Sequence, residues 1–280
     1  MKNQLLHIFR NSPMGRENLM QSAWFCEKQF GLSLAVFVPQ ATEFLLEFDG
    51  GTVPVDLDGS YLAFPETARE HVEEILARFN VQFHFHTPEV YGDGKTPILP
   101  GGWAMLACPR VISEQSGRIG LGHIGPRVRG IVKEATCPVF IPATAFKAWT
   151  SVAIFFGGSR LGALAVAQGI ALARLARVPF TVYTQLDGTT PEACEDVLEE
   201  AGLLADVKAG SERWQIFSAG TLEQNLYEIP HDSLVVMGAA GHRLMAELIF
   251  GSKLELVQST LLNPLVVVGP KCHTPVELSP

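Results

Sequence analysis

The residues best suited to chemistry lie between positions 238 and 253. Gly238 and Gly241 follow a short apolar run, and Gly251, Ser252 and Lys253 come a few residues later. Glycines at the exit of a strand let the backbone approach an anion closely, because no Cβ is in the way. A helix that begins at Ser252 would point free N–H groups and the positive end of its dipole at the same place. The spacing therefore predicts a phosphate-binding loop.

Charged side chains in this loop fit the same chemistry. Arg243 and Lys253 could supply positive charge for a phosphate, and His242 lies between the glycines and could act as an acid or a base. Histidines at such positions are more often exposed loop residues. Ser252 also has an alternative role, because residues 252–255 fit a capping box in which the serine caps its own helix. No GxSxG elbow, HExxH or complete P-loop sequence GxxxxGK[ST] occurs, so we predict a binding site and no catalytic residue.

Two short apolar runs frame the loop and would hold it in place. Residues 234–237 and 265–268 have the length and composition of buried parallel strands. A helix over 252–262 is expected between them, and it ends before Pro264. In open α/β sheets, ligands bind outside the carboxyl ends of the strands, which is where this loop would lie.

The same order of predicted elements occurs twice along the chain. An apolar strand, a small polar turn and an S-x-x-G sequence that opens a helix occur at 5–15 and again at 152–162. Alternating strands and helices imply a parallel sheet covered by helices on both faces. In the second copy we expect strands near 152–156, 180–184, 214–217, 234–237 and 265–268, with helices near 162–177, 190–202, 221–229 and 252–262.

The spacing G-x2-G-x9-G-S, carried by Gly238, Gly241, Gly251 and Ser252, resembles the nucleotide-binding signature of the universal stress protein family. Together with the repeat, it makes the chain similar to a tandem member of that family. The resemblance implies an α/β fold of two tandem doubly wound parallel five-stranded sheets. It also implies that ATP or AMP, with or without Mg, binds to the second copy.

The family layout predicts domains at 1–145 and 150–280. The second would carry the intact motif, and the first would be degenerate. Aligning Pro138 with Pro264 places Gly125-Pro126 where the second copy has Gly251-Ser252, and Pro126 offers neither a hydroxyl nor an N–H. We therefore expect no nucleotide in the first copy.

Further candidate contacts follow from the resemblance. Gly157, Gly158 and Ser159 come after the first strand of the second copy, and Tyr183 and Thr184 end its second strand, where they could line the adenine. Family members that bind ATP usually carry an acidic residue just after the first strand, beside the adenosine. Gly157 stands at that position in this chain. The phosphate half of the site is therefore intact, whereas the base and ribose half lacks its usual carboxylate.

The first copy carries extra sequence. Asp49-Gly50-Gly51 predicts an inserted β-hairpin within 43–64, and residues 56–59 are interpreted as a turn because no later acidic ligand completes a calcium loop. Residues 87–102 are expected to form a loop. His84 and His86 share one face of a strand, but no third metal ligand is evident nearby, so we predict no metal site.

Composition limits the function classes. Net charge is −8, which argues against a nucleic-acid partner. No apolar run approaches the length needed to span a bilayer, and no signal-peptide pattern begins the sequence, so we expect a cytoplasmic protein with no membrane partner. The five widely spaced cysteines are interpreted as reduced core residues.

The expected partners are an adenine nucleotide and the other copy. Residues 139–141 and 265–268 could pair within one chain to give a pseudo-dimer, and a homodimer of such units stays open. The leading hypothesis is a nucleotide-binding protein of stress response or signalling without strong catalysis. A nucleotide-independent interaction scaffold and a weak ATPase or nucleotidyl transferase are the alternatives.

Overall fold

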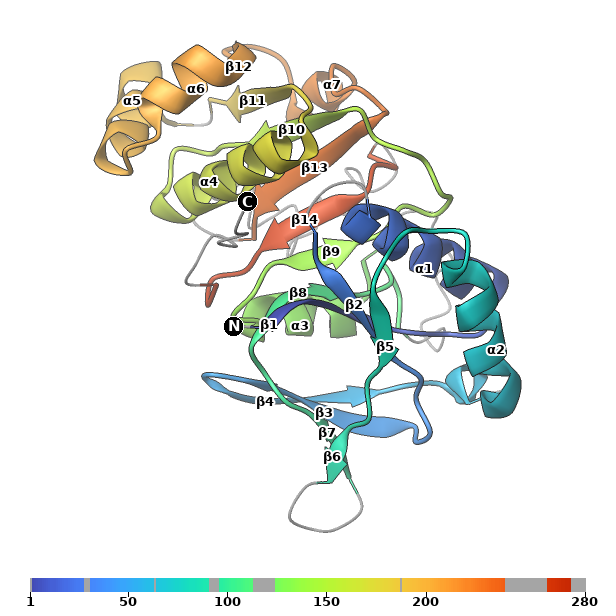
Figure 1. Ribbon diagram of the computed structural model, residues 1–280. Coiled ribbons are helices and arrows are strands. Elements are labelled where there is room, and N and C mark those ends of the chain that lie inside the picture. The colour runs from blue at the N-terminus through green and yellow to red at the C-terminus, as the bar shows by residue number, and fades with distance from the viewer. Residues whose placement is uncertain are drawn as a thin grey trace.

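The computed structural model describes residues 2–27, 31–62, 64–90, 96–112, 124–186, 188–239 and 261–272. One ten-stranded sheet runs through the molecule in the order β12-β11-β10-β13-β14-β9-β8-β1-β2-β5 (Figure 1). The elements from β1 to β9 are called the first half, and those from β10 to β14 the second half. Each half contributes five strands to the large sheet, in which neighbours within a half pair in parallel.

The strands that the first half gives to this sheet are short and mostly buried. They are β1 (Lys2–Ile8), β2 (Ser33–Phe37), β5 (Phe83–Phe85), β8 (Trp103–Ala107) and β9 (Val139–Ile141). Its helices are α1 (Pro13–Phe25), α2 (Pro65–Leu76), α3 (Pro126–Glu134) and the short 3-10 helix η2 (Gly59–Tyr61).

The second half repeats the pattern. Its strands are β10 (Ser151–Phe155), β11 (Phe180–Gln185), β12 (Ser211–Phe217), β13 (Ser233–Gly238) and β14 (Leu265–Val268). Its helices are α4 (Arg160–Ala176), α5 (Pro191–Glu200), α6 (Leu204–Gly210) and α7 (Leu222–Leu226). The predicted strands of this half are confirmed, but the sequence interpretation did not include α6. The helix expected over 252–262 lies mostly outside the described residues.

The repeated S-x-x-G sequences start equivalent helices in the two halves. The Ser12 hydroxyl accepts a hydrogen bond from the Gly15 amide of α1, and the Ser159 hydroxyl accepts one from the Gly162 amide of α4. Such side-chain caps satisfy backbone donors that have no partner inside the helix. The first helix therefore begins at Pro13, directly after its capping residue Ser12.

The core forms one layer on each face of the sheet, because successive strand residues point to opposite faces. On one face Leu5 and Val152 pack with α1, α2, α4 and α5. On the other face Leu6 and Val235 pack with α3, α7 and a second, smaller sheet. The small sheet thus covers in the first half a face that α7 covers in the second.

The small sheet has the order β4-β3-β7-β6, with bounds β3 (Glu43–Phe48), β4 (Gly51–Asp56), β6 (Glu89–Val90) and β7 (Pro97–Leu99). It lies apart from the large sheet in Figure 1. The antiparallel β3–β4 pair confirms the predicted hairpin. The loop predicted over 87–102 is wrong in part, because β6 and β7 extend this sheet through pairing that only the tertiary fold provides.

The two halves meet where β14 pairs antiparallel with β9, with Leu265 opposite Ile141 and Val267 opposite Val139. This confirms the predicted pairing within one chain. Gln21 of α1 reinforces the junction, since its amide donates to the carbonyl of Ala143 and accepts from the Ala143 amide, both at 2.9 Å. The antiparallel pair also places the carboxyl ends of the two sets of parallel strands at opposite edges of the large sheet. We call the carboxyl ends of the first half's strands in the large sheet, β1, β2, β5, β8 and β9, the first crest. We call the carboxyl ends of the second half's strands, β10 to β14, the second crest.

No helix within the described residues combines the length and the apolar character needed to cross a bilayer. The described cysteines are all free and buried, which agrees with their interpretation as reduced core residues.

Candidate functional site

The second crest contains the point at which strand order reverses. β10 is the first strand of its half, and it lies between β11 and β13. Gly157 and Gly158 follow β10 directly, and Gly238 ends β13. Ligands of doubly wound sheets bind outside the carboxyl ends of the strands at such a reversal. The fold therefore brings these three predicted glycines to the edge at which a ligand would bind.

Packing explains two of the glycines without any ligand. A Cβ at Gly238 would lie 3.3 Å from the carbonyl oxygen of Leu161 in the first turn of α4. Gly158 has a φ of +74°, and a Cβ there would lie 3.1 Å from the sulfur of Cys194. A side chain at either position would thus disturb α4 or α5 even if no nucleotide binds.

The remaining predicted contacts on these strands are engaged inside the protein. The Ser159 hydroxyl caps α4. The ring of Tyr183 is buried and stacks on Phe217, with ring centroids 6.2 Å apart. The buried Thr184 hydroxyl accepts a hydrogen bond of 3.0 Å from the Trp214 indole N–H. Any contact that these three residues make with a ligand would therefore come mainly from their backbones.

The other candidates of the phosphate loop are Gly241, His242, Arg243, Gly251, Ser252 and Lys253, and all six lie outside the described residues. The two strands that frame them are described, and β13 pairs in parallel with β14.

At the first crest, the exit of β1 is occupied by side chains of the same half. Arg10 follows β1 at the position that corresponds to Gly157, and its guanidinium lies over the ring of Tyr61 at 5.4 Å from the centroid. The same guanidinium lies 3.9 Å from a carboxylate oxygen of Asp58. Both partners belong to the inserted segment around η2. The insertion therefore supplies the groups that contact Arg10 at the exit of β1.

Asp58 has a structural role in the first half. Its carboxylate accepts hydrogen bonds from the Ser60 amide and hydroxyl, and so caps η2. Asp56 pairs instead with Arg127 at 3.3 Å. Within the described residues, no group of three or more histidine, cysteine or acidic side chains could hold a metal ion. His86 packs edge-on against Trp103.

The loop that follows β8 in the first half ties the halves together. Arg110 is buried and donates to the Pro142 carbonyl at 3.2 Å and to the Asn263 carbonyl at 2.6 Å. Burial lowers the pKa of this guanidinium to about 10. The corresponding loop of the second half carries the first glycines of the motif. Gly125 precedes Pro126 at the start of α3 without a side-chain cap, as the missing hydroxyl predicts.

Sequence reasoning missed Arg10 and Arg110. The signal was present, because a charged residue at or just beyond the exit of a buried strand is unusual unless it has a partner. The partners, however, are distant in the chain: Asp58 lies about fifty positions from Arg10, and Pro142 and Asn263 lie 32 and 153 positions from Arg110.

Titratable groups with shifted pKa values lie away from the second crest or are unsuited to acid–base chemistry there. Burial raises the pKa of the Cys194 thiol, so it stays protonated beside Gly158. The hydrogen bond from the Thr150 hydroxyl lowers the pKa of Asp232, which lies at the amino end of β13.

No protein-family model matches the sequence, and no curated protein matches it either. Solved structures do match the fold. A universal stress protein from Archaeoglobus fulgidus has a TM-score of 0.59 at 14% identity, covering 96% of this chain and 97% of that one. A putative universal stress protein from Pseudomonas aeruginosa has a TM-score of 0.56 at 12% identity, covering 96% and 94%.

A third match has a different name. The cytoplasmic domain of a prokaryotic cation chloride cotransporter has a TM-score of 0.54 at 11% identity, covering 99% of this chain and 100% of that domain. Identities this low establish shared architecture and leave function open. The chain has the α/β fold of tandem universal stress proteins.

Proposed function

We propose that this chain binds an adenine nucleotide, ATP or AMP, at the second crest and acts in stress response or signalling without strong catalysis. The observation that carries the proposal is the contrast between the crests. Gly157, Gly158 and Gly238 meet at the strand reversal of the second half. Arg10 and its partners Asp58 and Tyr61 occupy the corresponding position in the first half.

The sequence motif supplies the other support. Gly241, Gly251 and Ser252 stand at the family spacing after β13 and before β14, with Arg243 and Lys253 available as cations. Backbone amides and one hydroxyl around these positions would hold the phosphates. Mg would be carried by the phosphates, because the described second crest offers no acidic cluster for it.

The base and ribose would be held mainly by the backbone. Gly157 brings no carboxylate to the ribose, and the side chains of Tyr183 and Thr184 are committed to the core. We therefore expect a weaker affinity than a site with all of the family contacts would have. Replacing Gly157 by Asp restores the usual acidic group and should strengthen ATP binding.

Calorimetry with ATP on the full chain tests the proposal. The variant Ser252→Ala, combined with Lys253→Gln, should lose most of the binding. Thr190→Ala is the control for the loss of a hydroxyl, because the Thr190 hydroxyl accepts a hydrogen bond from the Ala193 amide and caps α5. Gly238→Val is a poor probe, since its side chain would meet Leu161 in any case. Absence of binding to the wild-type chain at millimolar ATP would refute the proposal.

A nucleotide-independent scaffold is the second candidate. It is favoured by the missing acidic residue at Gly157 and by the fold shared with a cotransporter cytoplasmic domain. The two candidates differ in one measurement. ATP should raise the melting temperature of a nucleotide-binding protein by mass action and leave that of a scaffold unchanged.

The proposal includes a cytoplasmic location and leaves homodimer formation open. Sedimentation of the purified chain with and without ATP would show whether copies associate and whether the nucleotide changes that association.

A further inference from the structure

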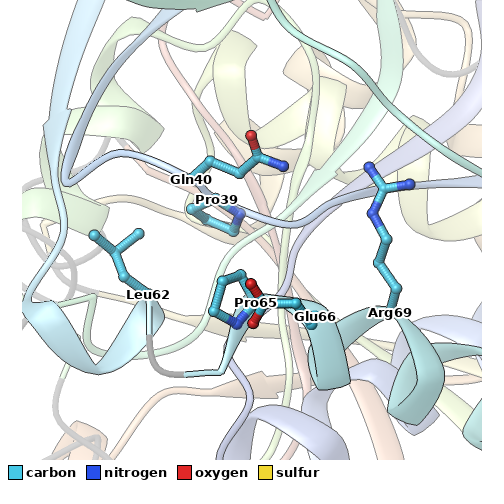
Figure 2. Close-up of a pocket in the computed structure, with 6 residues that line it drawn as sticks. All are labelled: Pro39, Gln40, Leu62, Pro65, Glu66 and Arg69. Atoms are coloured by element: carbon cyan, nitrogen blue, oxygen red, sulfur yellow. The ribbon is translucent and has the colours of Figure 1, made fainter.

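The first half contains a cavity that the proposed nucleotide site does not use. Its volume is about 410 Å³, and it lies beyond the carboxyl end of β2, against the first turn of α2. Figure 2 shows Pro39 and Gln40 on one side, Pro65 and Glu66 opposite, and Leu62 and Arg69 at the two ends. A space of this size suits a small metabolite.

The loop into α2 has an unusual conformation at the same place. Phe64 precedes the helix with φ 54° and ψ 58°, in the left-handed region that costs a bulky residue free energy. Its side chain is 74% exposed, and it makes no capping hydrogen bond for α2. The Phe64 carbonyl accepts hydrogen bonds from the Ala68 amide and the Thr67 hydroxyl in the first turn of α2, whereas its ring is left exposed to solvent. Strain of this kind is often retained where it serves a binding site.

Two opposite charges line the cavity within one turn of helix. The Glu66 carboxylate and the Arg69 guanidinium are both exposed, and neither forms an ion pair with another residue of the described part of the chain. Arg69 lies over the ring of Phe85 at 4.8 Å, which fixes the face of the guanidinium and leaves its edge free to donate. The side-chain amide of Gln40 faces the same space (Figure 2).

The balance of charge identifies the class of ligand. A phosphate would meet Arg69 favourably but would be repelled by Glu66 at close range. A ligand with one carboxylate and one ammonium group can satisfy both residues. Pro39, Leu62 and Pro65 provide an apolar wall for the rest of the molecule.

We propose that this cavity binds a free amino acid with an apolar side chain. Its carboxylate accepts hydrogen bonds from Arg69, its ammonium group donates to Glu66, and its side chain packs on Pro39, Leu62 and Pro65. This site lies in the first half and is independent of the proposed nucleotide site, so either can exist without the other.

Calorimetry with L-leucine on the full chain tests the inference. We expect saturable binding at millimolar or lower concentration. N-acetyl-leucine lacks the ammonium group and 3-methylbutylamine lacks the carboxylate, so each should bind at least about tenfold more weakly, as expected for one lost charge-assisted contact. Absence of saturation with leucine, equal binding of either analogue, or tighter binding of inorganic phosphate would overturn the proposal.

Charge-neutral variants assign the contacts. Arg69→Gln should weaken leucine binding at least about tenfold and leave 3-methylbutylamine binding unchanged. Glu66→Gln should likewise weaken leucine binding at least about tenfold, and it should leave N-acetyl-leucine binding unchanged. Glu70→Gln is the matched control, because Glu70 is exposed on the same helix and does not line the cavity. Melting temperatures verify that each variant folds. If Arg69→Gln and Glu66→Gln both bind leucine like the wild-type chain, the cavity is not the site and the inference fails.

Discussion

Arg10 and Gly157 follow the first strand of the same repeated unit, and they make the two crests different. Arg10 contacts Asp58 and Tyr61 of the inserted segment, so protein side chains occupy the exit of β1 at the first crest. Gly157 is buried and carries no side chain, and Gly158 and Gly238 lie nearby at the second. One fold can therefore place a guanidinium with side-chain partners after the first strand of one half and glycines after the first strand of the other.

The loops after the fourth strands differ in the same way. In the first half this loop sends Arg110 across the junction to the carbonyls of Pro142 and Asn263. In the second half it carries the glycine motif. The first half uses its crest for structure, which leaves the second half as the place where a nucleotide would bind.

The largest contrast between the halves should come from the S-x-x-G glycines. A Cβ at Gly15 would lie 1.9 Å from the backbone carbonyl oxygen of Arg10, whereas one at Gly162 would lie 3.1 Å from the ring of Phe156. The Phe156 ring can shift more easily than backbone. Gly15→Ala should lower the free energy of unfolding by about 4 kcal/mol or more.

Gly162→Ala is the companion variant. Better helix propensity should offset its crowding, so we expect a change within about 1 kcal/mol. Urea denaturation measures both variants. Equal losses would mean that the two crests are packed alike.

The second prediction breaks the junction. Arg110→Ala removes a buried donor from two carbonyls and leaves a cavity, so it should lower the free energy of unfolding by about 2–4 kcal/mol. Arg127→Ala is the control, because the Arg127–Asp56 pair is partly exposed and should be worth less than about 1 kcal/mol. Denaturant titration of both variants tests this prediction, which fails if the two losses match.

The third prediction concerns acid stability and compares His7 of β1 with Ile154, its counterpart in β10. Burial lowers the pKa of His7 from 6.5 to about 3. Below pH 6.5, His7 is protonated in the unfolded chain but stays neutral in the folded chain until the pH approaches 3. The contribution of neutral His7 to the free energy of unfolding is therefore complete above pH 6.5 and is lost as pH falls towards 3.

This proton uptake should make the wild-type chain about 2 kcal/mol less stable at pH 5 than at pH 7 through His7 alone. His7→Ile should remove that part of the slope. Unfolding measured at several pH values decides the matter, and an unchanged slope in the variant would show that other groups cause the acid sensitivity.

The prediction with the smallest expected effect tests whether the Thr184 side chain at the second crest contacts a ligand. Thr184→Val leaves the Trp214 indole without its acceptor and should lower the free energy of unfolding by about 1 kcal/mol. ATP affinity should change less than about twofold, because the hydroxyl faces the core. A large loss of ATP binding with unchanged stability would instead make Thr184 a ligand contact.

Much of the fold could be predicted because its signals are local. Apolar runs such as Leu265–Val268 and the turn sequence Asp49-Gly50-Gly51 identify strands and a hairpin without knowledge of distant residues. β6 and β7 escaped prediction because they are only two and three residues long. Their strand character depends on pairing with each other and with β3, which no local pattern contains.

In the candidate site, too, features with a local sequence signal could be predicted and features that depend on distant residues could not. The glycine spacing after β13 can be recognised from the sequence alone. The contacts of Arg10 at the first crest depend instead on Asp58 and Tyr61, which lie far from Arg10 in the chain. Tyr183 and Thr184 were expected to line the adenine. The structure gives their side chains core partners, Phe217 and Trp214, that the pattern of a single strand cannot reveal.

The central claim is that the second crest is open to an adenine nucleotide and the first is not. Calorimetry of ATP binding to the full chain tests it most directly when wild type, Ser252→Ala and Pro126→Ser are compared. We predict one site per chain that Ser252→Ala weakens at least about tenfold and Pro126→Ser leaves unchanged. Two sites per chain, no binding at millimolar ATP, or binding that survives Ser252→Ala intact would contradict the account.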